Sequence, residues 1–190
     1  MLPAPHALAF HPVTPERLPG LARFLERHGK FRYCAGMRWR MASSAFSRST
    51  KEERADALER LVQEGTPIGV LAYLDQDPVG WCSVAPRGSY AGLERYRALP
   101  RIDDRPVWSV VCFFVSTRIR RAGATLGLLK AAVEYAASER AEIIEGYPVE
   151  PGARLYTYMG SPATFRAAGF LDVTPRGQSR KVMRYFVKSN

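Results

Sequence analysis

Residues 107–137 constrain the fold more than any other part of this sequence, because an apolar run passes through a basic turn directly into an amphipathic helix. The run Val107–Val115 is rich in Val, Phe and Trp, which is typical of a strand buried on both faces. Beyond the turn, apolar residues recur at helical spacing, namely Leu126, Leu129, Val133 and Ala136. The sequence therefore predicts a central strand that is followed by a helix packed on the sheet.

The turn between this strand and this helix has the composition of a phosphate site. Arg118, Arg120 and Arg121 lie in it, and Gly123 stands where the helix begins. The first N–H groups of a helix have no intrahelical partner and lie at the positive end of the helix dipole, so they attract anions. A Walker loop would need Gly-Lys-Ser/Thr, and a dinucleotide-binding turn would need a fuller glycine pattern. We expect a phosphate-bearing ligand here; the alternative is an ordinary turn with solvated arginines.

The spacing of Val115, Arg120, Gly123 and Thr125 resembles the acyl-CoA-binding motif of the GNAT N-acetyltransferases, V-x-x-x-x-R/Q-x-x-G-x-G/A. Thr125 departs from that motif, because the family usually has Gly or Ala at its position. Downstream, residues 165–170 resemble the short helix and Gly-Phe pair near the end of GNAT domains, and residues 182–187 resemble the closing strand. The resemblance covers roughly residues 67–187 in the order of its elements.

Turn and cap residues divide the chain into alternating strands and helices. Strands are predicted at 7–13, 67–74, 78–85, 107–115, 143–149 and 182–187, and helices at 14–27, 50–63, 88–98, from 123 onward and near 165. Thr50 and Glu53 form a capping-box pattern, and Asp75–Pro78 is a hairpin turn. This order, with the GNAT resemblance, implies an α/β (α+β mixed) fold: a mostly antiparallel mixed sheet with splayed central strands, flanked by helices. We expect one domain over residues 1–190.

Composition narrows the classes of function. The formal net charge of +10 favours anionic partners, such as CoA phosphates, nucleic acid or acidic substrates, although no run of five basic residues marks a nucleic-acid tail. Cys34, Cys82 and Cys112 form no Cys-x-x-Cys and the histidines are few, so we expect neither a metal site nor a disulfide framework. No apolar run reaches the ~20 residues that span a bilayer, and no signal peptide is evident. A cytoplasmic protein is expected, and a homodimer is compatible with the sequence.

The GNAT resemblance assigns the contacts to acetyl-CoA. The backbone N–H of Phe113 would polarise the thioester carbonyl, and Val115 would pair with the pantetheine amides. Backbone N–H groups would bind the pyrophosphate from Arg121, Ala122, Gly123, Ala124 and Thr125. The side chain of Arg118 or Arg120 would reach the phosphates.

The resemblance also places the proton donor. The family usually has a Tyr four residues before the Gly of the Gly-Phe pair, and this chain has Phe165 there, which has no proton to give. Tyr158, on the loop that leads into the same short helix, is the candidate acid, with Tyr156 and Ser161 as rivals. The alternative is that both tyrosines only pack.

Glu145 is the candidate base, because it lies within the apolar segment 143–149. Burial there would raise its pKa, as a base that works near neutral pH requires. The alternative is an ion pair with one of the many arginines, which would lower that pKa instead. Asp103, Asp104 and Glu150 are further candidates on loops.

The acceptor site is expected in the aromatic and basic segment 31–40, where GNAT enzymes vary. Arg38 and Trp39 are substrate-binding candidates there, through bidentate bonds and stacking, and Tyr147 is a third. The alternative for Trp39 is a core position. The leading hypothesis is transfer of an acetyl group from acetyl-CoA to a primary amine of a small molecule by direct attack. A non-catalytic acyl-CoA sensor and an aminoacyl-tRNA-dependent transferase are the alternatives.

Overall fold

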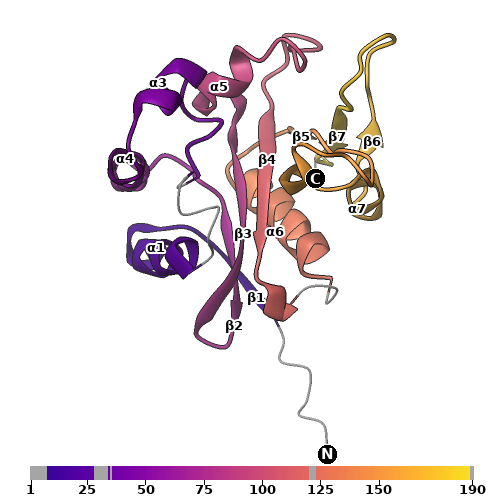
Figure 1. Cartoon of the computed structure of the whole chain (residues 1–190). Coiled ribbons are helices and arrows are strands. Elements are labelled where there is room, and N and C mark those ends of the chain that lie inside the picture. The colour runs from indigo at the N-terminus through magenta and orange to yellow at the C-terminus, as the bar shows by residue number, and fades with distance from the viewer. Residues whose placement is uncertain (1–7, 28–33, 35, 120–122, 189–190) are drawn as a thin grey trace, which may run out of the picture.

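The computed structural model describes residues 8–27, 34, 36–119 and 123–188, which form one seven-stranded sheet with helices against both faces (Figure 1). The strand order is β1-β2-β3-β4-β5-β7-β6. The strands are β1 (Leu8–Pro12), β2 (Val70–Leu74), β3 (Asp77–Pro86), β4 (Trp108–Val115), β5 (Ile143–Gly146), β6 (Leu171–Asp172) and β7 (Met183–Phe186). Every neighbouring pair is antiparallel except β4 and β5, which are parallel. The predicted mixed, mostly antiparallel sheet is confirmed.

Helices lie against both faces of the sheet. The α-helices are α1 (Leu18–Arg27), α3 (Ser43–Arg48), α4 (Lys51–Gln63), α5 (Ala91–Glu94), α6 (Ala124–Ser138) and α7 (Pro162–Ala167). Short 3-10 turns are η1 (Pro15–Arg17), η2 (Arg87–Ser89), η3 (Thr117–Ile119) and η4 (Thr157–Met159). Helix α6 lies along one face, whereas α1 and α4 lie beside the opposite face of β2–β4 (Figure 1).

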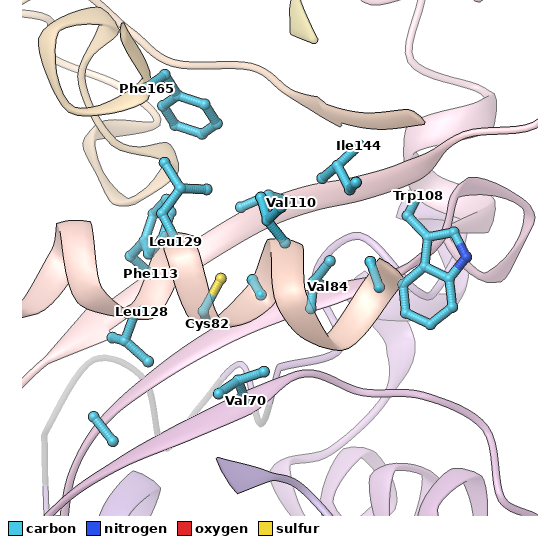
Figure 2. Packing of buried hydrophobic residues seen from close by; sticks show 14 of the residues in the cluster. Val70, Cys82, Val84, Trp108, Val110, Phe113, Leu128, Leu129, Ile144 and Phe165 are labelled. Atoms are coloured by element: carbon cyan, nitrogen blue, oxygen red, sulfur yellow. The ribbon is translucent and has the colours of Figure 1, made fainter. Parts of the chain in front are cut away.

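The main core lies between α6 and the sheet. Leu128 and Leu129 of α6 are fully buried, and they pack with Cys82, Val84 and Val110 from the central strands (Figure 2). This helix carries the apolar stripe that the sequence predicted, which is what allows it to cover a sheet face. The stripe also fixes how α6 sits relative to the strands that form the site.

Glycine allows α6 to approach the sheet edge closely. A Cβ at Gly127 would lie 2.5 Å from Cζ of Phe10 in β1, which is closer than carbon atoms approach without contact strain. Any larger residue would therefore require the Phe10 ring to move.

The central strands diverge after a short parallel pairing. Trp108–Val110 of β4 pair with Ile144–Gly146 of β5, and the pairing ends there, although β4 continues to Val115. A Cβ at Gly146 would lie 2.0 Å from the ring of Phe165 in α7. The Phe165 ring therefore occupies the space beside the end of β5. Beyond Val110, the β5-facing main chain of β4 has no strand partner among the described residues. The predicted splay is present.

The predicted helix cap is confirmed, whereas some predicted bounds of helices and strands are not. The capping box of α4 is formed: the N–H of Glu53 donates to Oγ1 of Thr50, and the N–H of Thr50 donates to the Glu53 carboxylate at 2.7 Å. Several bounds differ from the prediction: β2 begins at Val70 instead of residue 67, β5 ends at Gly146 instead of residue 149, and the segment 88–98 contains only the end of η2 and the short α5. Strand β6 and helix α3 were not predicted.

Candidate active site

The divergence of β4 and β5 opens a cleft of about 730 Å³, which we call the β4–α6 cleft. Its lining comes from the end of β4, the start of α6, the loop after β5, and α7. The lining residues are Phe113, Val115, Ile119, Gly123, Ala124, Thr125, Leu126, Val149, Glu150, Pro151, Gly152, Thr157, Tyr158, Gly160, Ser161, Ala163, Thr164 and Ala167. Predicted site residues from two distant segments therefore meet in one cleft.

The N-terminus of α6 offers its N–H groups to this cleft. Gly123 adopts the left-handed conformation (φ 70°) and no side chain caps the helix. Gly123, Ala124, Thr125 and Leu126 all line the cleft. Since α6 has 15 residues, the first N–H groups lie at the positive end of a long dipole and fit a pyrophosphate group. The residues present therefore suit the phosphate end of a CoA molecule.

The arginines of the turn divide into two groups. Arg118 is well exposed and donates to Asp77 at 2.6 Å, so its guanidinium is held at the β2–β3 hairpin, and the residue does not line the cleft. The structure therefore gives no support to its predicted contact with phosphate. Arg120, Arg121 and Ala122, the other predicted contacts of this turn, lie outside the described residues.

A second cavity of about 460 Å³, which we call the Trp39 cavity, lies on the other side of β4. It is lined by Cys34, Gly36, Arg38, Trp39, Phe46, Val111, Cys112, Thr157 and Tyr158. The predicted acceptor residues Arg38 and Trp39 both belong to it. Arg40 does not: its Nη2 donates to the carbonyl of Pro67 at 2.9 Å, and its guanidinium lies over the ring of Tyr90. Trp39 is also 2% exposed and packs in the core. It therefore occupies the core position that the sequence left open, and it also lines the cavity in which an acceptor was expected.

Tyr158 and Thr157 line both cavities, so the β4–α6 cleft and the Trp39 cavity meet at η4. Burial raises the pKa of Tyr158 well above its usual value, and the nearby Arg38 opposes this only partly. The hydroxyl therefore stays protonated at neutral pH and is available as a donor. This position, where a donor ligand and an acceptor ligand would meet, is the one that an acid in group transfer needs.

The rival acids occupy other positions. Tyr156 lines neither cavity, its hydroxyl accepts from the Tyr96 hydroxyl at 3.2 Å, and the guanidinium of Arg180 lies over its ring. Ser161 lines the β4–α6 cleft but caps α7, where its Oγ accepts the N–H of Thr164. Tyr158 is thus the tyrosine that geometry favours.

Phe165 is a core residue. It is fully buried, with its ring 4.9 Å from that of Phe170 and 6.0 Å from that of Phe113. Figure 2 shows Phe165 and Phe113 on the same side of the sheet as α6. The Phe165 ring packs over Gly146 and does not line the β4–α6 cleft. At the position of the family's usual tyrosine, this chain therefore has a buried ring that packs between α7 and the splayed strands.

Glu145 is held by two buried arginines. Its Oε1 lies 2.9 Å from Nη1 of Arg87 and its Oε2 lies 2.7 Å from Nε of Arg184. The Tyr147 hydroxyl donates to the same Oε1 at 2.7 Å. All four side chains are buried, and neither Glu145 nor Tyr147 lines either cavity. Of the two readings left open by the sequence, this geometry favours the ion pair, and it leaves Tyr147 out of contact with a bound acceptor.

The network extends to loop residues before β4. Arg87 donates through Nε to Glu94 at 2.7 Å and through Nη2 to the carbonyl of Leu99 at 2.7 Å. Arg184 forms a bidentate pair with Asp103, and this hydrogen bonding lowers the pKa of the Asp103 carboxyl. Because a lowered folded-state pKa favours the charged form, the network is weakened on acidification below the unfolded pKa of Asp, about 3.9. Its role is to join the 87–103 segment to the sheet.

Sequence reasoning missed several lining residues. Phe46, Val111 and Cys112 line the Trp39 cavity, and Val149, Pro151 and Gly152 line the β4–α6 cleft. Cys112 and Val111 flank Phe113 on the predicted central strand, so their nearness to the reaction centre was available as a signal. Phe46 had no such signal, because its place depends on how α3 packs. Glu150, which was predicted as a further base, is the only Asp or Glu in the described lining of the cleft, and its side chain is 63% exposed.

The described residues contain no group of three His, Cys, Asp or Glu side chains placed to hold a metal ion. None of their helices has the length and apolarity needed to cross a bilayer.

Comparison with known proteins identifies relatives of this arrangement. The model of the acetyltransferase (GNAT) family matches residues 34–160. No curated protein sequence matches the chain.

Solved structures share the fold at low sequence identity. Ribosomal-protein-alanine N-acetyltransferase from Brucella melitensis superposes with a TM-score of 0.53 at 17% identity, over 94% of this chain and 99% of that one. Aminoglycoside N-acetyltransferase AAC(6')-Iy in complex with CoA gives 0.58 at 13% identity, over 92% and 95%. PaiA N-acetyltransferase from Thermoplasma acidophilum in complex with coenzyme A gives 0.54 at 11%, over 95% and 99%. At these identities the similarity establishes the fold.

Proposed function

Since the chain belongs to the GNAT acetyltransferase family, whose members are acyl-CoA-dependent N-acyltransferases, we propose that it transfers an acetyl group from acetyl-CoA to a primary amine of a small molecule by direct attack. The observation that carries this proposal is the meeting of the β4–α6 cleft and the Trp39 cavity at Tyr158. One cavity would hold the donor and the other the acceptor.

The β4–α6 cleft supplies the contacts that acetyl-CoA needs. The N–H groups at the start of α6, from Gly123 to Leu126, would bind the pyrophosphate. The unpaired main chain of β4 would bond the pantetheine amides at Val115, and the N–H of Phe113 would donate to the carbonyl oxygen, where negative charge develops. Acetyl-CoA supplies the activated acetyl group. The large aromatic ring of Phe113 packs toward the α6 core, so only the main chain of this residue has a role in the chemistry.

Tyr158 would supply the proton. When the amine nitrogen bonds to the acetyl carbon, the carbon–sulfur bond breaks and the Tyr158 hydroxyl protonates the departing sulfur. The amine loses one proton to solvent, and solvent returns one to the Tyr158 oxygen, so the enzyme ends the cycle unchanged. A thiolate is a fair leaving group, since thiols have a pKa near 8.5, so we expect this help to be smaller than in amide hydrolysis.

Replacing Tyr158 with Phe is expected to lower kcat by about 10- to 100-fold, because the ring remains but the proton donor is lost. The KM for acetyl-CoA should change little. Burial raises the pKa of Tyr158, so the wild-type rate should not fall through ionisation of this group below about pH 10. Initial rates of CoA release, measured across a panel of amines and from pH 6 to 10, provide the test.

Tyr156→Phe is the matched control, because it removes a hydroxyl two residues away that lines neither cavity. We expect its kcat to stay within about threefold of wild type, as for a surface substitution away from the reaction. Equal losses in both variants would show that the two tyrosines act through packing, and Tyr158 would lose its role as acid.

The sensor alternative rests on Phe165, which stands at the position of the family's usual acid. A sensor would bind CoA but acetylate nothing. Stabilisation against heat by CoA, with no turnover across a broad amine panel, would favour the sensor over the enzyme.

A further inference from the structure

The described lining of the Trp39 cavity contains one cation and no carboxylate. Arg38 is its single charged lining residue among those described. The Arg38 guanidinium lies over the rings of Trp39 and Phe46, with its carbon 5.3 Å and 5.6 Å from their centroids, and it makes no hydrogen bond or ion pair with any described residue. The residues outside the described ranges include no Asp or Glu, so no acidic side chain there can neutralise it.

The other ionisable groups of this cavity are neutral at physiological pH. Burial raises the pKa of the Cys34 thiol, the Cys112 thiol and the Tyr158 hydroxyl, so all three stay protonated. The field inside the cavity is therefore positive. A polycation would meet like charge there, which costs several kcal/mol at an interface.

The remaining surface suits a ring. Trp39, Phe46, Val111 and Tyr158 line the cavity, and a volume of about 460 Å³ is within the range of pockets for small ligands. The indole Nε1–H of Trp39 is buried and has no acceptor in the described part of the chain.

Resting on the proposed function, we infer that the acceptor is a small aromatic amine that carries a carboxylate, and that Arg38 is the residue that selects it. The ring stacks among the aromatic side chains of the Trp39 cavity. The carboxylate pairs with the Arg38 guanidinium, whose planar donors match its two oxygens. The amine then lies toward Tyr158, where the two cavities meet.

Matched ligand pairs test this inference by binding, with no need for turnover. The probes are L-phenylalanine, L-tyrosine, L-tryptophan and 4-aminobenzoate, each compared with its carboxamide by calorimetry on the CoA-loaded protein. Loss of a hydrogen-bonded charge pair corresponds to about 10- to 100-fold in affinity. We expect at least one acid to bind about tenfold or more tightly than its amide, and spermidine and kanamycin to bind more weakly than that acid.

Arg38→Met keeps an apolar stem over Trp39 and Phe46 and removes the charge. It should abolish the preference for acid over amide while leaving CoA affinity unchanged. Arg48→Met is the control, because Arg48 is exposed on α3, lines neither cavity, and its loss lowers the net charge equally. The acid preference should persist in that variant.

The outcomes separate this inference from the proposed function. If no acid binds more tightly than its amide, if a polycation binds best, or if the preference survives Arg38→Met, the inference is wrong, whether or not acetyl transfer occurs. If the preference depends on Arg38 but no amine is acetylated, the Trp39 cavity still selects aromatic carboxylates through Arg38, and the proposed function fails.

Discussion

Glu145→Gln is expected to lower the free energy of unfolding by about 3–5 kcal/mol, the cost of breaking a buried ion pair by removing one partner. The carboxylate lies between the guanidiniums of Arg87 and Arg184, and all three side chains are no more than 5% exposed. A glutamine amide has one acceptor oxygen and one donor NH₂ group, so it would bond one arginine and face the other with donor against donor. Arg87 would keep Glu94 and Arg184 would keep Asp103, but both would lose the carboxylate that they share inside the core.

Urea unfolding followed by circular dichroism measures this loss. Glu139→Gln is the control: it removes the same charge from an exposed position just after α6, and its effect should stay within about 0.5 kcal/mol. A loss below about 1 kcal/mol in Glu145→Gln would mean that the network is not a major source of stability.

The same variant distinguishes an ion pair from a general base. Glu145 lines neither cavity, so the rate per folded molecule and its pH profile should match wild type once the folded fraction is known. Disappearance of the acidic limb of the pH–rate profile, in protein shown to be folded, would instead restore Glu145 as the base.

Thr125→Glu is expected to weaken CoA binding by about 100-fold or more while leaving the free protein equally or slightly more stable. Thr125 lies in the first turn of α6 and lines the β4–α6 cleft. A carboxylate there would meet the same N–H groups as the pyrophosphate, and like charges in contact cost several kcal/mol. In the absence of ligand, an acidic residue at a helix N-terminus contributes about 0.3–1 kcal/mol of stability.

Weaker CoA binding without a loss of stability would distinguish a blocked pyrophosphate site from a damaged fold. Calorimetric titration with CoA gives the affinity, and thermal unfolding without ligand gives the stability. The glutamine of Thr125→Gln has nearly the same shape as the glutamate of Thr125→Glu but carries no charge. The CoA affinity of Thr125→Gln should therefore stay within about tenfold of wild type. Wild-type affinity in Thr125→Glu would place the pyrophosphate elsewhere.

The central strand, the turn and α6 could be predicted from the sequence, because their signals are local. The apolar run of β4 and the helical period of α6 lie next to each other in the chain. Gly123 then indicates where the helix begins, and the resemblance to the family motif predicts which ligand binds there. The predicted backbone contacts at Phe113, Val115 and 123–125 all line one cleft for this reason.

The partners of the charged residues could not be predicted, because they come from far along the chain. Glu145 meets Arg87 and Arg184 across 58 and 39 residues, and Arg118 meets Asp77 across 41. A periodic pattern predicts which face of a helix or strand a residue occupies, but it does not predict which distant side chain contacts it. The predicted end of β5 was wrong for a similar reason, since the ring that packs against Gly146, where β5 ends, belongs to Phe165, 19 residues further along the chain.

Hydrogen–deuterium exchange with and without acetyl-CoA tests the central claim most directly, because it reports on individual stretches of main chain. We predict slower exchange at the N–H groups of residues 123–126 and in the Val111–Val115 part of β4, with no change around Arg87. Unchanged exchange in both stretches at saturating acetyl-CoA, or protection confined to other surfaces, would contradict the assignment of the β4–α6 cleft as the donor site.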